Sequence, residues 1–158
     1  MLPPLPERMR PRTLDGYVGQ RHLIGQGCIL RNMIDNGTLS SFILWGPPGV
    51  GKTTLSHIVA KSLGREFFTL SAVSAGVKDV RDIIDRARSN SLFSGGQPPI
   101  LFIDEIHRLS RAVEEILYPA MEDYSLDIII GKGPSARSIR LPIPRFTLIG
   151  ATTRAGQL

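Results

Sequence analysis

The stretch GPPGVGKT, Gly46 to Thr53, decides the fold of this chain. It matches the pattern G-x-x-x-x-G-K-[ST], in which glycines let backbone N–H groups turn toward phosphate oxygens. The apolar run FILW (42–45) precedes it, and a segment with apolar residues at helical spacing (53–64) follows it. A buried strand, this loop and a helix, in that order, are the context that confirms a phosphate-binding loop (P-loop). A ligand-free glycine turn is the alternative interpretation.

The residue types in the loop predict their roles. Lys52 would reach the β- and γ-phosphates of a nucleotide, and the Thr53 hydroxyl would complete a Mg²⁺ shell. The N-terminal dipole of the following helix favours the same anion. The nucleotide-binding residues predicted here are Pro48, Gly49, Val50, Gly51, Lys52, Thr53 and Thr54.

A second motif, ILFIDEIH (100–107), has four apolar residues followed by two acidic ones. Ligands of open α/β sheets gather outside the carboxyl ends of the strands, so Asp104 would face the Mg²⁺ held by Thr53. Glu105, one residue on, is placed to orient or deprotonate an attacking water. An ordinary Asp-Glu turn after a core strand is the alternative. The three scattered histidines and one cysteine form no metal-ligand pattern, and His107 is expected to be a hydrogen-bonding residue beside the site.

A third motif, FTLIGATTR (146–154), is a predicted buried strand ending in Thr152 and Thr153. A hydroxyl at this strand end would lie near the γ-phosphate or the attacking water. The alternative is a plain core strand, and the spacing alone does not choose between the two.

The remaining pattern alternates apolar strands with helices. We expect helices over about 23–36, ended by Gly37, over 77–90, and after Ser110 as N-cap, with a strand over 66–72. Such alternation predicts the α/β class with a parallel sheet covered on both faces, a three-layer fold. The first dozen residues, rich in proline and arginine, are expected to form an extended arm.

Composition limits the class of protein. The chain has 158 residues, enough for one ordinary domain, and a net charge of +5 that fits either a polyanionic partner or simple solubility. Cys28 is the only cysteine, so a reducing, cytoplasmic location is expected. The N-terminus lacks the apolar centre of a secretory signal, and no run reaches the ~18 apolar residues of a membrane span.

The stretch IIIGKGPSARSIRLPI (128–143) places two glycines and a lysine in an apolar run. It is a poor second phosphate cradle, because Pro134 follows the glycines and no amphipathic helix follows them. A β-hairpin insertion over about 126–144, with Lys132 as a solvated turn residue, fits better. An isolated apolar hairpin is marginal in water, so it needs a surface to pack against. That surface is either a partner or the chain's own domain.

Together, GPPGVGKTT, LFIDEIHRL and LIGATTR resemble the AAA+ ATPase core, which implies a five-stranded parallel sheet. Residues of about 100–158 resemble the RuvB family of Holliday-junction branch-migration ATPases. Residues of about 1–95 resemble the RarA (MgsA) family of replication-associated ATPases. The two resemblances together predict a chimeric, engineered or consensus gene. They divide the chain into an adenine-side arm (1–18) and a P-loop core (19–158).

The resemblance also implies ATP or ADP with Mg²⁺ as cofactors and adds site residues. It places Thr153 at sensor 1, a position occupied by Asn in many AAA+ proteins. It places the hairpin, Ile128 to Ile143, against the junction-binding protein RuvA. The further nucleotide contacts that it implies are Met9, Arg10, Tyr17 and Val18 on the adenine side, and Glu122, Asp123 and Tyr124.

In the families that this chain resembles, the arginine finger and the helical lid would lie beyond Leu158. An arginine finger contributes roughly 10³–10⁵ in rate, so this chain alone is expected to hydrolyse ATP slowly or not at all, and not to form the family's hexamer. Three functions remain open. They are the ATP-binding core of a RuvB-type motor acting on four-way DNA junctions, a RarA-type ATPase at stalled replication forks, and a non-catalytic P-loop scaffold.

Overall fold

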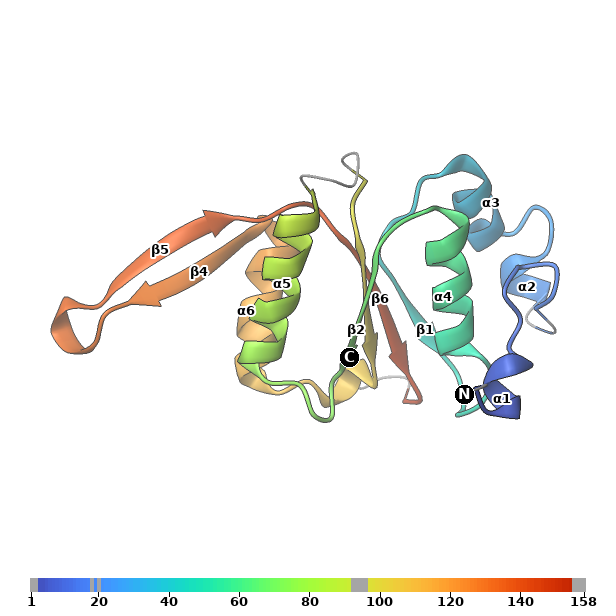
Figure 1. The fold of residues 1–158 in the computed structure, drawn as a ribbon, viewed down its shortest axis with the longest axis horizontal. Coiled ribbons are helices and arrows are strands. Elements are labelled where there is room, and N and C mark those ends of the chain that lie inside the picture. The colour runs from blue at the N-terminus through green and yellow to red at the C-terminus, as the bar shows by residue number, and fades with distance from the viewer. Residues whose placement is uncertain (1–2, 18, 20, 92–96, 155–158) are drawn as a thin grey trace.

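The main sheet of the protein has four parallel strands. The structure is a computed structural model that describes residues 3–17, 19, 21–91 and 97–154. The sheet order is β1-β6-β3-β2, so the strands next to each other in space are far apart in the chain (Figure 1). Their bounds are β1 (Phe42–Trp45), β2 (Phe67–Ser71), β3 (Ile100–Asp104) and β6 (Thr147–Thr152). All three pairings are parallel, as the alternating pattern predicts.

The predicted number of five strands is wrong for the described part of the chain. Within it, β1 pairs with β6 only, which makes β1 an edge of the sheet. A fifth strand would need a further apolar segment, and the described chain continues only to Arg154, two residues past β6. The expected β-hairpin is present, but it forms a separate two-stranded sheet.

Helices cover both faces of the main sheet, which confirms the three-layer α/β fold. One core cluster joins α3 (Ile29–Asn36) and α4 (Lys52–Ser62) to Phe102. The other joins α5 (Val77–Ser91) and α6 (Arg111–Glu122) to the opposite face (Figure 1). Alternate residues of a strand point to opposite faces, and those of β3 divide between the two clusters: Ile100 and Phe102, Leu101 and Ile103. This strand is buried on both sides, as its unbroken apolar sequence predicts.

Two expectations for the N-terminal part need correction. The extended arm contains a short helix, α1 (Leu5–Arg8), because Pro4 takes the N-cap position and proline is compatible with the first helical turn. The single helix expected over about 23–36 is divided into α2 (Arg21–Ile24) and α3, separated by a stretch with two glycines. Gly37 ends α3 in the left-handed conformation, as predicted.

The hairpin consists of β4 (Ser125–Ile130) and β5 (Arg137–Pro142), with a short 3-10 turn, η2 (Gly133–Ser135), between them. It projects away from the main body (Figure 1). Its root is packed: Leu126 and Ile143 are buried against Ala120 of α6. Further out, the side chain of Ile139 is 44% exposed. The distal hairpin therefore does not fold back onto its own domain.

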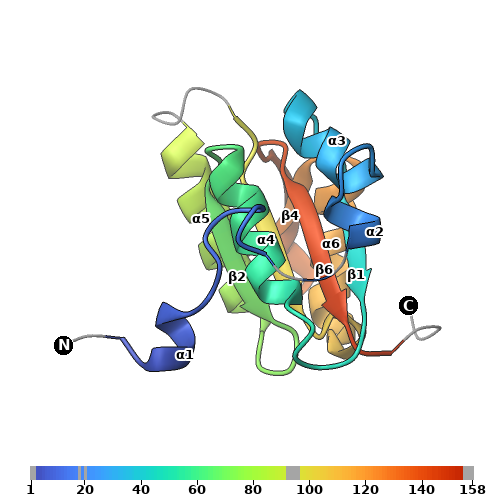
Figure 2. The ribbon, with the colours of Figure 1, turned by 90° about the vertical axis from the view of Figure 1, so that its right-hand side faces the viewer.

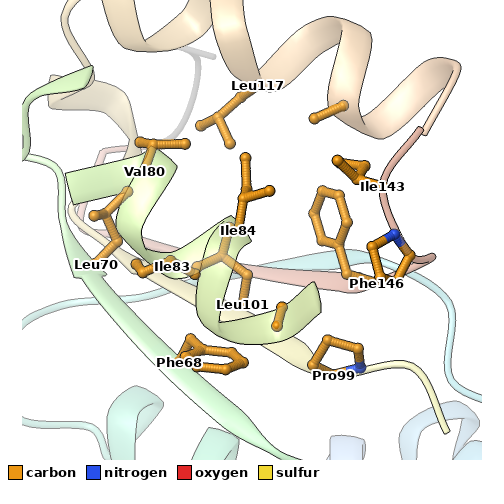
Figure 3. Close-up of a pocket in the computed structure, with 13 residues that line it drawn as sticks. Phe68, Leu70, Val80, Ile83, Ile84, Pro99, Leu101, Leu117, Ile143 and Phe146 are labelled. Carbon is orange, nitrogen blue, oxygen red and sulfur yellow. The ribbon is translucent and has the colours of Figure 1, made fainter. Parts of the chain in front are cut away.

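The core on the α5–α6 face is not completely filled. A small cavity of about 40 Å³ lies between α5, α6 and the hairpin root, with almost entirely apolar walls (Figure 3). Phe68, Leu117 and Phe146 are among its lining residues. Its apolar lining is that of a hydrophobic core and offers little to bind a polar ligand. In the described ranges, no helix has the length and apolar character needed to cross a membrane.

Replacing Ser110 with alanine is expected to lower the free energy of unfolding by about 1 kcal/mol. The Ser110 hydroxyl accepts a hydrogen bond from the Val113 N–H at 3.3 Å and caps α6, as the sequence predicts. Alanine leaves that first-turn donor without its side-chain partner. Urea denaturation would measure the loss, with Ala112→Ser on the exposed side of the same turn as a control. Equal stability of wild type and Ser110→Ala would contradict the capping role.

Candidate functional site

The P-loop connects the end of β1 to the start of α4, and β6 anchors it. The Gly46 N–H donates to the Thr152 carbonyl at 3.2 Å, so the loop begins against the end of its neighbouring strand. Gly49 and Gly51 have φ values of +82° and +94°, in the left-handed region that favours glycine. Gly51 is also the N-cap residue of α4. The loop backbone thus turns directly into a helix N-terminus, which is the arrangement that binds anions.

The Lys52 ammonium lies across this loop. Its Nζ donates to the carbonyls of Gly46 at 2.7 Å and of Pro47 at 3.0 Å. Both carbonyls belong to the first two residues of the P-loop, so these hydrogen bonds hold the ammonium against the loop. Phosphate oxygens at the same place would accept from the same ammonium.

Tyr17 fixes the second half of the loop. Its hydroxyl lies 3.0 Å from the Val50 carbonyl and 3.2 Å from the Gly51 carbonyl, both of which are acceptors. A Cβ on Gly51 would meet this hydroxyl at 2.5 Å, so the glycine is required for the close approach. Burial raises the pKa of the Tyr17 phenol. The N-terminal segment thereby packs against the P-loop (Figure 2).

A pocket of about 220 Å³ opens beside this contact. Its walls combine apolar side chains with the loop itself: Tyr17, Leu44, Trp45, Gly46, Pro47, Val50, Lys52 and Leu55. The pocket therefore has an apolar side, suited to an aromatic base, and a cationic side at Lys52.

For the other predicted adenine-side residues, the described part of the structure shows no hydrogen bond to the P-loop like that of Tyr17. Arg10 lies near His57 of α4, whose pKa is lowered by burial first and by the Arg10 charge second. Met9 follows α1 and is 75% exposed. Val18 lies outside the described residues.

Asp104 and Glu105 lie at the carboxyl end of β3, at the same end of the sheet as the P-loop. Asp104 is the last residue of the strand and is half-buried. Glu105 has φ +53°, a left-handed conformation that costs a non-glycine residue about 1–3 kcal/mol. It precedes the 3-10 turn η1 (Ile106–Arg108). Such strain is characteristic of functional positions.

His107 joins this acidic pair to β6. Its Nε2 lies 3.4 Å from the Glu105 carboxylate, and its Nδ1 lies 2.8 Å from the Thr152 hydroxyl. The His107 side chain is only 4% exposed, and Thr152 is 1% exposed. The expectation that His107 is a hydrogen-bonding residue beside the site is confirmed.

The protein would supply only two side-chain ligands, Thr53 and Asp104, to the candidate metal site. The described residues contain no group of three or more His, Cys, Asp or Glu side chains that could hold a metal ion. The hydroxyl of Thr53, in the first turn of α4, and the carboxylate of Asp104 are at the same edge of the sheet. A site of this composition fits Mg²⁺, which usually keeps several waters and takes one or two carboxylates together with phosphate oxygens.

Comparison with known proteins identifies the family. Residues 9–158 match the family described as Holliday junction DNA helicase RuvB P-loop domain. The chain belongs to the RuvB family. The match begins at residue 9 and so includes most of the segment that resembles RarA.

Solved RuvB structures agree with this membership. The Holliday junction branch migration motor RuvB of Thermotoga maritima is 36% identical, with a TM-score of 0.69, over 95% of this chain and 44% of that chain. A point mutant of the same RuvB gives 36% identity and a TM-score of 0.71 over 96% of this chain and 44% of that chain. NtrX from Brucella abortus, in complex with ADP, shares the fold at 18% identity, with a TM-score of 0.58 over 87% of this chain and 30% of that chain. The chain thus spans less than half the length of the RuvB proteins it matches.

Within this RuvB-family domain, the threonine that the structure ties to the site is Thr152. Its hydroxyl contacts His107, whereas Thr153 lies one residue past β6 and is half-buried. Sequence reasoning chose Thr153 by alignment and overlooked the contact of Thr152. The sequence signal that could have indicated this contact is that His107 comes just after one buried strand and Thr152 ends another.

Glu122, Asp123 and Tyr124 do not join the P-loop in the same chain. α6 starts near the carboxyl end of β3 and runs back along the sheet, so its last residues reach the opposite edge. There Tyr124 packs against the buried cluster that contains Ala120, and the Arg145 guanidinium lies 5.3 Å from the centroid of its ring. These three residues thus lie at the opposite end of the sheet from the P-loop of the same RuvB-family domain.

Replacing Tyr17 with phenylalanine is expected to lower the free energy of unfolding by about 1 kcal/mol, the usual contribution of one hydrogen bond. The ring would stay in place, while the Val50 and Gly51 carbonyls lose their donor. Urea denaturation would measure the change, and Tyr118→Phe, at an exposed position, is the control. A Tyr17→Phe protein as stable as wild type would show that the hydroxyl contributes nothing to the loop.

Proposed function

We propose that this chain is the ATP-binding core of a RuvB-type motor that acts on DNA junctions. The observation that carries the proposal is the convergence of the P-loop, Asp104 and Glu105 at one edge of the sheet. Membership of the RuvB family supports it. RuvB of Thermotoga maritima is described as a Holliday junction branch migration motor, and the same class of substrate is proposed here.

The side chains divide the work of binding. Lys52 and the loop N–H groups would hold the β- and γ-phosphates of ATP or ADP. Thr53 and Asp104 would hold Mg²⁺, which neutralises phosphate charge when bound. Glu105 would orient or deprotonate the attacking water. Thr153 is proposed as sensor 1, next to the hydrogen-bonded Thr152.

The pocket beside Tyr17 is proposed to take the adenine. Its apolar side is formed partly by Tyr17 and Val50, and Met9, Arg10 and Val18 belong to the same N-terminal segment. Glu122, Asp123 and Tyr124 would contribute only to a nucleotide held by another copy, because they lie at the far edge of their own sheet. Assembly of several copies is accordingly part of the proposal.

Calorimetry with ATP and Mg²⁺ tests the proposal. Micromolar binding is expected, because the P-loop backbone and the Lys52 ammonium are already arranged around one anion-binding position. Absence of binding by the wild-type protein would overturn the proposal and favour a non-catalytic scaffold. A cytoplasmic location is proposed on the strength of the single cysteine.

The hairpin is proposed as the surface that docks RuvA. It projects from the body, and its outer part carries the exposed Ile139. A salt bridge of 3.1 Å between Arg140 and Asp127 stiffens the pair of strands. The resemblance of residues 1–95 to RarA supports a second candidate, a RarA-type fork ATPase of chimeric origin, for which no RuvA docking is expected.

A pull-down with the C-terminal domain of RuvA distinguishes the two. Ile139→Asp, or deletion of residues 128–140, is expected to abolish capture, since a charge replaces an apolar contact in the first and the arm is lost in the second. Lys132→Ala, in the exposed turn, is the matched control and should bind as wild type does. Equal capture of all variants would rule out the hairpin as the docking surface.

A further inference from the structure

We infer that His107 is a positioning residue that holds the Glu105 carboxylate and ties it to the end of β6. The inference rests on the proposed role of Glu105 in ATP hydrolysis. It adds a chain of polar contacts that connects the candidate base to the strand that anchors the P-loop.

The contacts fix the direction of this chain. A carboxylate is an acceptor only, so the inference places the Nε2 proton of His107 toward Glu105, whose carboxylate oxygen is 3.4 Å away. In a neutral imidazole the other nitrogen, Nδ1, is then an acceptor. The Thr152 hydroxyl, 2.8 Å from Nδ1, must therefore donate to it.

The far end of the chain is consistent with this direction. The Arg154 N–H donates to the Thr152 hydroxyl oxygen at 3.1 Å. The hydroxyl proton has two acceptors in reach, Nδ1 of His107 at 2.8 Å and the Arg154 carbonyl at 3.3 Å, and the nearer one is His107. The chain thus runs from the Arg154 N–H through Thr152 and His107 to Glu105. The Thr152 carbonyl also accepts from the Gly46 N–H at 3.2 Å, so the same residue contacts the P-loop and the histidine.

Packing holds the turn that carries His107 close to β6. A Cβ on Gly150 would meet the Ile106 side chain at 2.8 Å, so glycine at this position permits η1 to lie directly on the strand. His107 is 4% exposed, against 29% for the Glu105 side chain. The imidazole is therefore fixed by its surroundings, while the carboxylate that it contacts still reaches the solvent-facing side of the site. Such an arrangement positions a catalytic group through a buried partner.

Glu105 needs such support. Its left-handed backbone conformation costs a non-glycine residue energy and persists only where the surroundings over-determine it. Within the described residues, the structure shows a polar contact between the Glu105 carboxylate and the His107 imidazole at 3.4 Å. Loss of the imidazole would remove this contact and leave the 29% exposed carboxylate without it.

Nuclear magnetic resonance of the ligand-free, ¹⁵N-labelled chain tests the inference without requiring nucleotide binding. His107 is expected as the tautomer protonated at Nε2, with the Nδ1 resonance displaced by Thr152→Val and the Nε2 resonance displaced by Glu105→Ala. His22→Gln and His57→Gln assign the other two imidazoles. A bare Nε2 on His107, or resonances unmoved by both substitutions, would overturn the inference.

A matched pair of variants separates positioning from mere packing. The amide of His107→Asn ends near the position of Nδ1 and can partner only Thr152, whereas that of His107→Gln reaches the position of Nε2. The Glu105 carboxyl ¹³C resonance should move in the Asn variant and return toward wild type in the Gln variant. Equal shifts in both variants would show a structural role only. Calorimetry with ATP on the same samples reports the proposed function separately, because its failure leaves these ligand-free shifts unchanged.

Discussion

Replacing Lys52 with alanine is expected to abolish measurable ATP binding. Charge-assisted hydrogen bonds contribute about 1.5–3 kcal/mol each. Loss of an ammonium that serves both the β- and γ-phosphates should therefore weaken binding by on the order of 10²-fold or more. The Lys52 ammonium already lies against the Gly46 and Pro47 carbonyls, so its position above the P-loop needs little rearrangement. Isothermal titration calorimetry with Mg·ATP measures the effect.

Lys61→Ala is the matched control. Lys61 lies in the last turn of the same helix, α4, and is exposed, so its removal takes away the same charge far from the P-loop. Its affinity for ATP should equal that of wild type. If both variants lost affinity equally, the effect would come from net charge rather than from a contact with phosphate, and the assignment of Lys52 would fail.

Replacing Phe102 with alanine is expected to lower the free energy of unfolding by about 3–5 kcal/mol. The ring is completely buried at the centre of β3 and stacks on Phe67, with 5.9 Å between the centroids. Removing it leaves a cavity that the sheet and α4 cannot close. A loss of this size is a large part of the ~5–15 kcal/mol that stabilises a typical domain. Urea denaturation followed by circular dichroism measures it.

Tyr118→Ala provides the comparison for Phe102. This residue of α6 is 56% exposed, so deleting a ring of similar size creates no enclosed cavity. Its effect should be within about 0.5 kcal/mol of wild type, as for ordinary surface positions. Similar destabilisation by the two substitutions would show that β3 is not the centre of the core.

The local parts of the fold and site could be predicted from the sequence because their signals are short. The P-loop needs only eight adjacent residues, and the Asp104–Glu105 pair needs only the four apolar residues before it. Ser110 as an N-cap, Gly37 as a helix end and the hairpin of β4 and β5 depend on neighbours within a few positions. The parallel sheet followed from the alternation of such segments.

Contacts between segments that are far apart in the chain could not be predicted from the sequence. The hydroxyl of Tyr17 on the Val50 carbonyl and the hydroxyl of Thr152 on His107 join residues 33 and 45 positions apart, respectively. The same reason explains why the sheet of the described residues has four strands rather than the predicted five. It also explains why the position of Glu122, at the opposite end of the sheet from the P-loop, did not follow from its sequence.

The sequence by itself determined the P-loop fold and the chemical groups of the site, since motif residues act through their own backbone and nearest neighbours. Only the tertiary structure decided which buried partners hold those groups. Strand order and helix direction bring the partners together, and these depend on packing across the whole chain.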